Sequence, residues 1–275
     1  MAKDLRYVSA TGAVVELDGP VTWSQGALDA RGREWEYALG YRDAYNLTRP
    51  ARAVTLEVWT NPAEADNMRR VFDADVANST PGELIAENVW HQRALVTASQ
   101  ARSAFAGNIG LQLTVLLLDG AWWAVKAIEF APDDGSEAYE FLDYPYDYDY
   151  DYSRASSSKT VDTGLLVASP VRIIIYGPAT NPYVVAGGNR YQVDVNVPSG
   201  GYLVIDGRAK TIELVAQNGT ATDVFAAGVR GSGEGGGSYI FENVAPGEQP
   251  VSWDGSFGFD FGWYDEEGEP PWSRS

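Results

Sequence analysis

The chain has 275 residues, of which 45% are hydrophobic, and a formal net charge of −18. This apolar fraction is enough to fill real cores, so a wholly disordered chain is excluded. The absence of cysteine excludes disulfides and thiolate metal sites. The single histidine, His91, leaves almost nothing from which to build a Ser-His-Asp machine or a multi-histidine metal site.

The charge also limits the partners of the chain. Strong acidity argues against a protein that wraps nucleic acid, because phosphate binding needs clustered lysine and arginine. Residues 1–132 carry 12 basic and 16 acidic residues, whereas residues 133–275 carry 8 and 22. This asymmetry indicates a domain boundary near residue 133. The N-terminus lacks a signal peptide, and the longest apolar run is too short to span a bilayer, so we expect cytoplasmic synthesis without membrane insertion.

The first half of the chain opens with strand-like segments at LRYVSA, AVVELDG and REWEYALGY. After a polar stretch, RAVTLEVWT alternates cleanly between apolar and polar residues, as expected of a half-buried strand. NVWHQRALVTAS and GNIGLQLTVLLL predict further strands, and Asp119-Gly120 predicts a hairpin from the second of these into AWWAVKAIEF. Residues 1–132 are therefore predicted to form a mostly antiparallel sheet or barrel.

One helix is predicted, over residues 62–77. Asn61 is a suitable N-cap, Pro62 takes the first helical position, and Glu64 follows the cap by three residues. Apolar side chains at helical spacing form a stripe that we expect to face the core and to support assembly: Ala65, Met68, Val71, Phe72 and Val76. The helix should therefore lie on a sheet and end before the turn in STPGEL.

Residues 165–275 carry a second set of short strand-like segments with recurring turn signals and no helical pattern. Such spacing is typical of a β-sandwich or jelly roll. The segment GSGEGG at 231–236 matches the G-x-G-x-x-G spelling of a dinucleotide-binding loop, which requires a helix directly after it. The strand-like SYIFENV follows instead, so we interpret the glycines as a hairpin loop and expect no cofactor.

Between these regions lies the run DYPYDYDYDY, in which tyrosine and aspartate alternate. In an extended segment the tyrosines point one way and the aspartates the other, so one side can pack on protein while the other stays hydrated. We interpret residues 133–164 as a strap and linker between two domains, and a floppy acidic linker is the alternative. The packing face of the strap would consist of Tyr144, Tyr146, Tyr148, Tyr150 and Tyr152.

The same run has the aspartate spacing that opens a calcium loop, at Asp147, Asp149 and Asp151. That loop needs glycine at its sixth position and glutamate at its twelfth. Tyr152 and Ser158 stand at those places, so we expect no metal site.

No residue constellation predicts catalysis. His91 lies in a strand-like segment without a nucleophile motif, and we interpret it as a packed or surface residue. Adjacent carboxylates occur by chance among 38 acidic residues, so they do not indicate a glycosidase. Trp253 and Trp263 could stack on a sugar, although packing in the sandwich is the favoured interpretation.

The order of several segments resembles the distal tail proteins of long-tailed, siphovirus-type bacteriophages, especially those of Gram-positive hosts. These segments are the helix followed by STPGEL, the DYPYDYDYDY run, VRIIIYGPATNPYVVAGGNRYQV, GYLVIDGRAKTIEL and the terminal EEGEPPW, which together span nearly the whole chain. The resemblance implies a mainly β protein. Its N-terminal domain (1–132) would be a tail-tube-like β-barrel or sandwich with one α-helix, and its C-terminal domain (165–275) a galectin-like β-sandwich.

The resemblance further implies a structural, non-enzymatic virion protein of the phage tail and baseplate. It would form a homohexameric ring at the distal end of the tail, after assembly in the host cytoplasm. Its partners would be the tail tube protein, the tape-measure protein and tail hub or fibre proteins, with DNA only as cargo passing through the lumen. Strands near 54–59 and 109–130 would line and close the ring.

Two other functions remain open from the sequence. The first is a carbohydrate-binding module with a structural N-terminal domain, for which Trp253 and Trp263 would supply the glycan contacts. The second is a cell-wall hydrolase, which no residue pattern in the sequence supports.

The ring implied by the resemblance also has a consequence for DNA. A ring with a neutral or negative lumen would let DNA slide, because few cations would hold phosphate.

Overall fold

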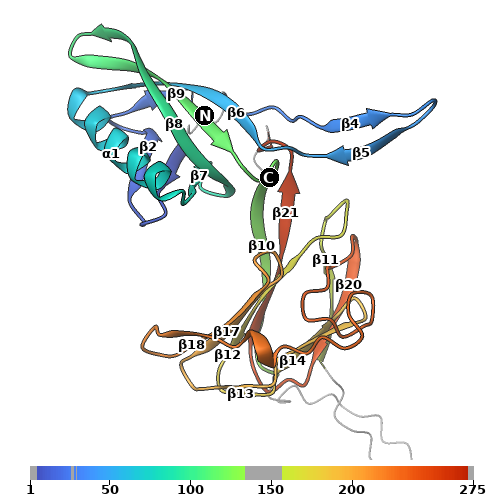
Figure 1. Cartoon of the computed structure of the whole chain (residues 1–275). Helices are drawn as coiled ribbons and strands as arrows, with labels where there is room; N and C mark the ends of the chain where they lie inside the picture. The colour runs from blue at the N-terminus through green and yellow to red at the C-terminus, as the bar shows by residue number, and fades with distance from the viewer. Residues whose placement is uncertain (1–4, 26–27, 29, 134–156, 272–275) are drawn as a thin grey trace, which may run out of the picture. The chain divides into compact units, whose positions relative to one another are not determined.

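The structure is a computed structural model that describes residues 5–25, 28, 30–133 and 157–271 (Figure 1). It divides into two compact units. Unit 1 comprises Met1–Ala124 and Glu266–Ser275, and unit 2 comprises Val125–Asp265. The prediction of a mainly β protein with one α-helix is confirmed for the described residues. The predicted three-part division of the chain at 133 and 165 stays a prediction.

Unit 1 is built on antiparallel strands that follow the order β2-β1-β7-β8-β9-β6-β3, with β4 and β5 as a separate pair. Its strands are β1 (Leu5–Val8), β2 (Val14–Asp18), β3 (Trp23–Ser24), β4 (Glu36–Leu39), β5 (Ala44–Thr48), β6 (Arg52–Thr60), β7 (Gly82–Ala86), β8 (Trp90–Phe105) and β9 (Asn108–Leu117). Two strands cross the boundary between the units, β10 (Trp122–Phe130) and β21 (Phe259–Glu267).

The helix α1 (Pro62–Asn78) begins where the sequence predicts. The Asn61 side chain accepts a hydrogen bond from the Glu64 amide at 2.9 Å, and Pro62 opens the first turn. The helix ends at Ser79, which adopts a left-handed conformation with φ of 54°. It packs on β8 and β9 and covers one face of their sheet (Figure 1).

The apolar stripe predicted for α1 divides into buried and exposed members. Met68 and Phe72 are buried, Ala65 and Val71 are partly buried, and Val76 is 38% exposed. Asp75 is buried instead, at 2% exposed, where its carboxylate accepts hydrogen bonds from the Tyr7 hydroxyl and the Ala10 amide. Asp75 and Val76 follow Phe72 by three and four residues, so they lie on either side of the row formed by Met68 and Phe72. The hydrogen bonds of Asp75 orient the helix so that Asp75 is buried and Val76 is exposed.

The hairpin predicted at Asp119-Gly120 is wrong. In the described residues β9 pairs with β6 and β8, and β10 pairs with β8 at Trp123 and is also adjacent to β21 in the sheet. The turn of the long hairpin is instead Ala106-Gly107, with φ of 50° and 83°, between β8 and β9. The Asp119 carboxylate binds the backbone amide and side chain of Arg93, which holds its own loop against β8.

Unit 2 is a sandwich of two antiparallel sheets around one hydrophobic core. One sheet has the order β19-β18-β17-β12-β21 and the other β11-β20-β14-β15, with a small β13-β16 pair besides. Its strands are β11 (Ser157–Asp162), β12 (Val171–Tyr176), β13 (Ala179–Thr180), β14 (Tyr183–Ala186), β15 (Asn189–Gln192), β16 (Asn196–Val197), β17 (Tyr202–Asp206), β18 (Thr211–Val215), β19 (Ala221–Asp223) and β20 (Glu248–Trp253). The predicted β-sandwich is thereby confirmed.

Candidate assembly surface

The three strands β6, β9 and β8 form a sheet whose face opposite α1 carries polar side chains. Strand alternation sends Leu56 and Leu113 toward the core of unit 1, so their neighbours Glu57 and Gln112 point to the opposite face. On that face Thr55 is exposed, as is Arg102, which donates to the Gln112 side-chain oxygen from its Nε at 2.8 Å. The face combines hydroxyl, amide and charged groups, which suits contact with water.

In the described residues, both outer strands of this three-stranded sheet have an edge along much of which no other strand is paired. In the described residues β6 pairs along its length with β9, whereas β3 reaches only Val58 and Trp59. The second half of β8, from Leu95 to Phe105, likewise has β9 on one side and no strand on the other in the described part of the chain. A strand edge that no other strand covers can serve as a template for pairing with another chain.

A second feature of unit 1 is a projecting β-hairpin, which we call the arm and define as residues 33–49. It contains β4 and β5, which pair only with each other in the described residues. Figure 1 shows the arm projecting beyond the start of β6, away from the hairpin of β8 and β9. Its large apolar side chains are exposed: Trp35 41%, Tyr37 60%, Leu39 72%, Tyr41 94%, Tyr45 50% and Leu47 57%.

The third feature is an apolar surface at the opposite end of β6, which we call the patch. It surrounds a shallow hollow of about 350 Å³ lined by Val21, Trp23, Trp59, Phe105 and Asn108. Phe105 is 77% exposed at the tip of the long hairpin, and Val21 and Trp23 are each 58% exposed. Apolar side chains gathered at one place on a surface typically mark an interaction site.

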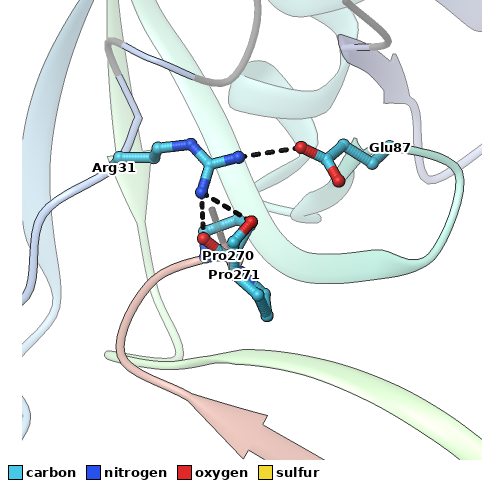
Figure 2. A network of polar contacts seen from close by, with 4 residues as sticks. All are labelled: Arg31, Glu87, Pro270 and Pro271. Carbon is cyan, nitrogen blue, oxygen red and sulfur yellow. Dashed lines mark hydrogen bonds and ion pairs between the residues drawn. The ribbon is translucent and has the colours of Figure 1, made fainter. Parts of the chain in front are cut away.

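The base of the arm is fixed by a polar cluster, which we call the clasp (Figure 2). Arg31 donates to the carbonyl oxygens of Pro270 and Pro271, and its Nη2 pairs with a Glu87 carboxylate oxygen at 2.8 Å. The arginine side chain is 9% exposed, so this ion pair is largely shielded from water. The clasp therefore ties the C-terminal segment of unit 1 to the chain just before the arm.

Two further contacts extend the clasp. The Gly32 amide donates to Glu269 at 2.8 Å, and Arg52 Nη2 donates to the Ala30 carbonyl at 2.8 Å. Burial lowers the pKa of the Arg52 guanidinium, against the opposing influence of Glu34 and Glu269. Because Gly32 and Arg52 flank the arm on both sides, the direction in which the arm leaves unit 1 is fixed at its root.

The structure buries the two tryptophans considered for glycan contact. Trp253 is 1% exposed and Trp263 3%, and both belong to the core of unit 2. Trp253 packs edge-on against Phe130 and Phe259, with ring centroids 5.4 and 5.1 Å apart. A sugar could not stack on these rings without the core opening.

The other residues considered from the sequence as possible sites are packed, form turns or lie outside the described residues. His91 lies 3.0 Å from Glu83 and stacks on Trp123 with ring centroids 4.6 Å apart, as a packed residue would. The glycine segment 231–236 forms turns with no helix after it. The strand predicted at SYIFENV and the hairpin loop before it are wrong, because no strand lies between β19 and β20 in this described stretch. Tyr144, Tyr146, Tyr148, Tyr150 and Tyr152 lie outside the described residues, as do Asp147, Asp149 and Asp151.

Within the described ranges there is neither a metal-ligand cluster nor a helix able to span a membrane. No three histidine, cysteine, aspartate or glutamate side chains gather closely enough there to hold a metal ion. None of the helices in those ranges has the length and apolar character needed to cross a bilayer.

Comparisons with known proteins identify the fold. No family model and no curated protein matches the chain. Among solved structures, the chain is similar to the Dit protein of phage SPP1, a hub of the adsorption apparatus in phages that infect Gram-positive bacteria. The TM-score is 0.56 at 9% identity, over 96% of this chain and 98% of that one.

The chain is equally similar to a chain of the phage P2 baseplate in its activated conformation with calcium. There the TM-score is 0.57 at 11% identity, over 98% of this chain and all of that one. The same baseplate with strontium gives a TM-score of 0.57 at 11% identity, over 97% and 99%. The fold expected from the phage tail resemblance is therefore confirmed over 96–98% of the chain.

Proposed function

We propose that the chain is a structural protein of a bacteriophage tail, a distal tail adaptor that forms a hexameric ring. The observation that carries the proposal is the fold: phage adsorption and baseplate proteins match both units, end to end, with TM-scores of 0.56 and 0.57. A match confined to the sandwich would have fitted many unrelated functions, since sandwiches are common scaffolds. A match to both units in one order is far more restrictive.

The unpaired edges of unit 1 supply a physical basis for the ring. The outer edge of β6 in one copy pairs with the outer edge of β8 in the next, so that each copy offers two different surfaces. Such a head-to-tail contact is heterologous, and it generates a closed ring when the rotation between copies closes. Closure also covers these two strand edges in every copy, and an exposed edge otherwise invites aggregation.

In this ring the polar face of β6, β9 and β8 lines the passage, and α1 lies outside it. The charged groups that we assign to this face are balanced: Glu57 and Asp119 against Arg93 and Arg102. Arg93 pairs with Asp119 at 2.6 Å, and Arg102 hydrogen-bonds Gln112, so the arginines already have partners. DNA would therefore meet few free cations as it slides through.

The second unit would serve as the outward-facing partner surface. The ring joins the tail tube and the tape-measure protein on one side to tail hub or fibre proteins on the other, as part of the virion assembled in the host cytoplasm. Residues 133–164, which contain the tyrosine and aspartate run at 143–152 and also the strand β11, would be the strap and linker. Burial of Trp253 and Trp263 argues against the carbohydrate-binding alternative, and we propose no enzymatic activity.

The test is electron microscopy of the purified full-length protein, combined with mass photometry over a concentration series. We expect six-fold rings with the mass of six chains. The alternative assembly is an open filament, in which the same head-to-tail contact fails to close. A chain that stays monomeric at every concentration, and also in the presence of the tail tube protein, would contradict the proposal.

A further inference from the structure

In the described structure, the arm pairs with no strand outside itself, and its large apolar side chains are exposed. A two-stranded hairpin alone is at best marginally stable in water. Trp35, just before β4, and Tyr37 and Leu39 within it are all more than 40% exposed. The clasp nevertheless holds the arm in one direction at its root. A fixed, apolar projection of this kind is built to be covered by something else.

The arm is also electrically neutral in an otherwise acidic chain. It carries three basic residues, Arg33, Arg42 and Arg49, and three acidic ones, Glu34, Glu36 and Asp43. The lining of the patch, by contrast, contains no charged residue at all. Like-charge repulsion between copies of a chain with net charge −18 is therefore smallest where these two surfaces meet.

The arm and the patch lie at opposite ends of the same strand. The arm leads directly into the start of β6 at Arg52, whereas Trp59 of the patch lies near its other end. β6 has nine residues, so its ends are about 26 Å apart at about 3.3 Å per residue. The arm points away from its own patch (Figure 1), so it can cover only the patch of another copy.

We propose that the arm of one copy docks on the patch of the next copy, with Tyr37 and Leu39 packing over Trp23, Trp59 and Phe105. The occupant of the patch is a second copy of this chain, because one surface of each kind at opposite ends is the arrangement that head-to-tail assembly requires. This inference deepens the proposed ring and rests on it. It assigns the apolar part of the interface, whereas the strand edges provide the hydrogen-bonded part.

The absence of cysteine allows a direct test by cross-linking. Ala44→Cys places a thiol on the arm, and Asn108→Cys places one at the rim of the patch, so both leave the apolar side chains in place. Mixing the two full-length variants, one of them labelled with ¹⁵N, and adding a short bismaleimide should give 44-to-108 links between copies. The matched control is Ala221→Cys, an exposed alanine on β19 of unit 2.

A second measurement compares how strongly variants of the protein assemble. Leu39→Asp and Phe105→Asp, at side chains 72% and 77% exposed in one copy, should each raise the concentration for half-assembly about tenfold or more. Leu166→Asp is the matched control, since Leu166 is 93% exposed in unit 2, and it should assemble as the unmodified protein does.

The outcomes separate this inference from the proposed function. Rings without 44-to-108 links, or links from 44 to 44, overturn the docking and leave the ring intact. Links in open filaments support the docking and contradict the closed ring. A protein that neither assembles nor cross-links contradicts both, and Leu39→Asp rings as stable as the unmodified ones overturn the docking.

Discussion

Replacing Tyr7 with phenylalanine removes the hydroxyl that joins α1 to the sheet of unit 1. This hydroxyl donates to the Asp75 carboxylate at 2.7 Å and accepts the Gly82 amide at 3.2 Å. Tyr7 is 0% exposed and Asp75 2%, so water cannot take the place of the hydroxyl while the core stays closed. Burial, aided by the hydrogen bond to Asp75, raises the pKa of Tyr7 above its usual range, so the hydroxyl keeps its proton.

The expected loss follows from the two groups that Tyr7→Phe leaves behind. A hydrogen bond to a charged group contributes about 1.5–3 kcal/mol, and a buried donor without an acceptor costs about 1–3 kcal/mol. The Ala10 amide lies 3.3 Å from each carboxylate oxygen of Asp75 and keeps part of the stabilisation. We therefore expect the free energy of unfolding of unit 1 to fall by about 3 kcal/mol.

Urea unfolding of the full chain, followed by circular dichroism and fluorescence, measures this loss. Tyr176→Phe in unit 2 is a matched control, because the Tyr176 hydroxyl also donates to an aspartate, Asp260, at 2.7 Å. Tyr176 is 41% exposed, so water can replace the bond, and we expect a change of about 0.5 kcal/mol or less. Equal losses in the two variants would refute the reasoning from burial.

Three further predictions concern the helix, the sandwich and the passage. Asn61→Ala removes the acceptor of the Glu64 amide and should destabilise unit 1 by about 1 kcal/mol in the same urea assay. Burial raises the pKa of Tyr191 and Tyr264, so the protonated side chains stabilise the folded state. This stabilisation is complete below pH about 10 and is lost progressively as pH rises above it. Tyrosinate absorbance from these residues should then increase together with unfolding. Thr55→Arg should leave the ring intact but give it salt-sensitive binding to DNA.

These predictions have their own controls. Asn67→Ala changes an exposed asparagine on the same helix and should cost less than the cap substitution. Tyrosinate absorbance that rises fully while circular dichroism stays native would contradict the assignment of the buried tyrosines. Thr220→Arg adds the same charge on unit 2, and DNA binding by this variant as tight as that of Thr55→Arg would count against a passage lined by β6.

The sequence predicts the elements whose signals are local. The cap at Asn61 and the spacing of Met68 and Phe72 indicate α1 because a helix is specified by its own residues. The sequence does not identify Asp75 as buried, since its partner Tyr7 lies 68 residues away in the chain. A long-range hydrogen bond of this kind leaves no periodic signal.

The turns and projecting strands are harder to predict for a related reason. Asp119-Gly120 is the stronger hairpin signal, yet Ala106-Gly107 makes the turn, because the partner of a strand is chosen by packing across the whole sheet. In a single copy, residues 97–105 and the arm have no buried face. Their patterns are unlike those of ordinary strands, as expected if the surfaces that would cover them lie on another copy of the chain, as we propose.

The distribution of charge predicts how salt should affect the proposed ring assembly. Unit 2 carries 8 basic and 20 acidic residues, so neighbouring copies repel one another through unit 2. Unit 1 carries 12 basic and 18 acidic residues. Its arm has no net charge, and the lining of its patch contains no charged residue. Salt shortens the range of repulsion to about 8 Å at 0.15 M and leaves apolar contacts in place. Ring assembly should therefore strengthen between 0.02 and 0.15 M salt (about 22 to 8 Å of screening length), as measured by mass photometry. Assembly that weakens with salt would mean that ion pairs, rather than the arm and the patch, hold the copies together.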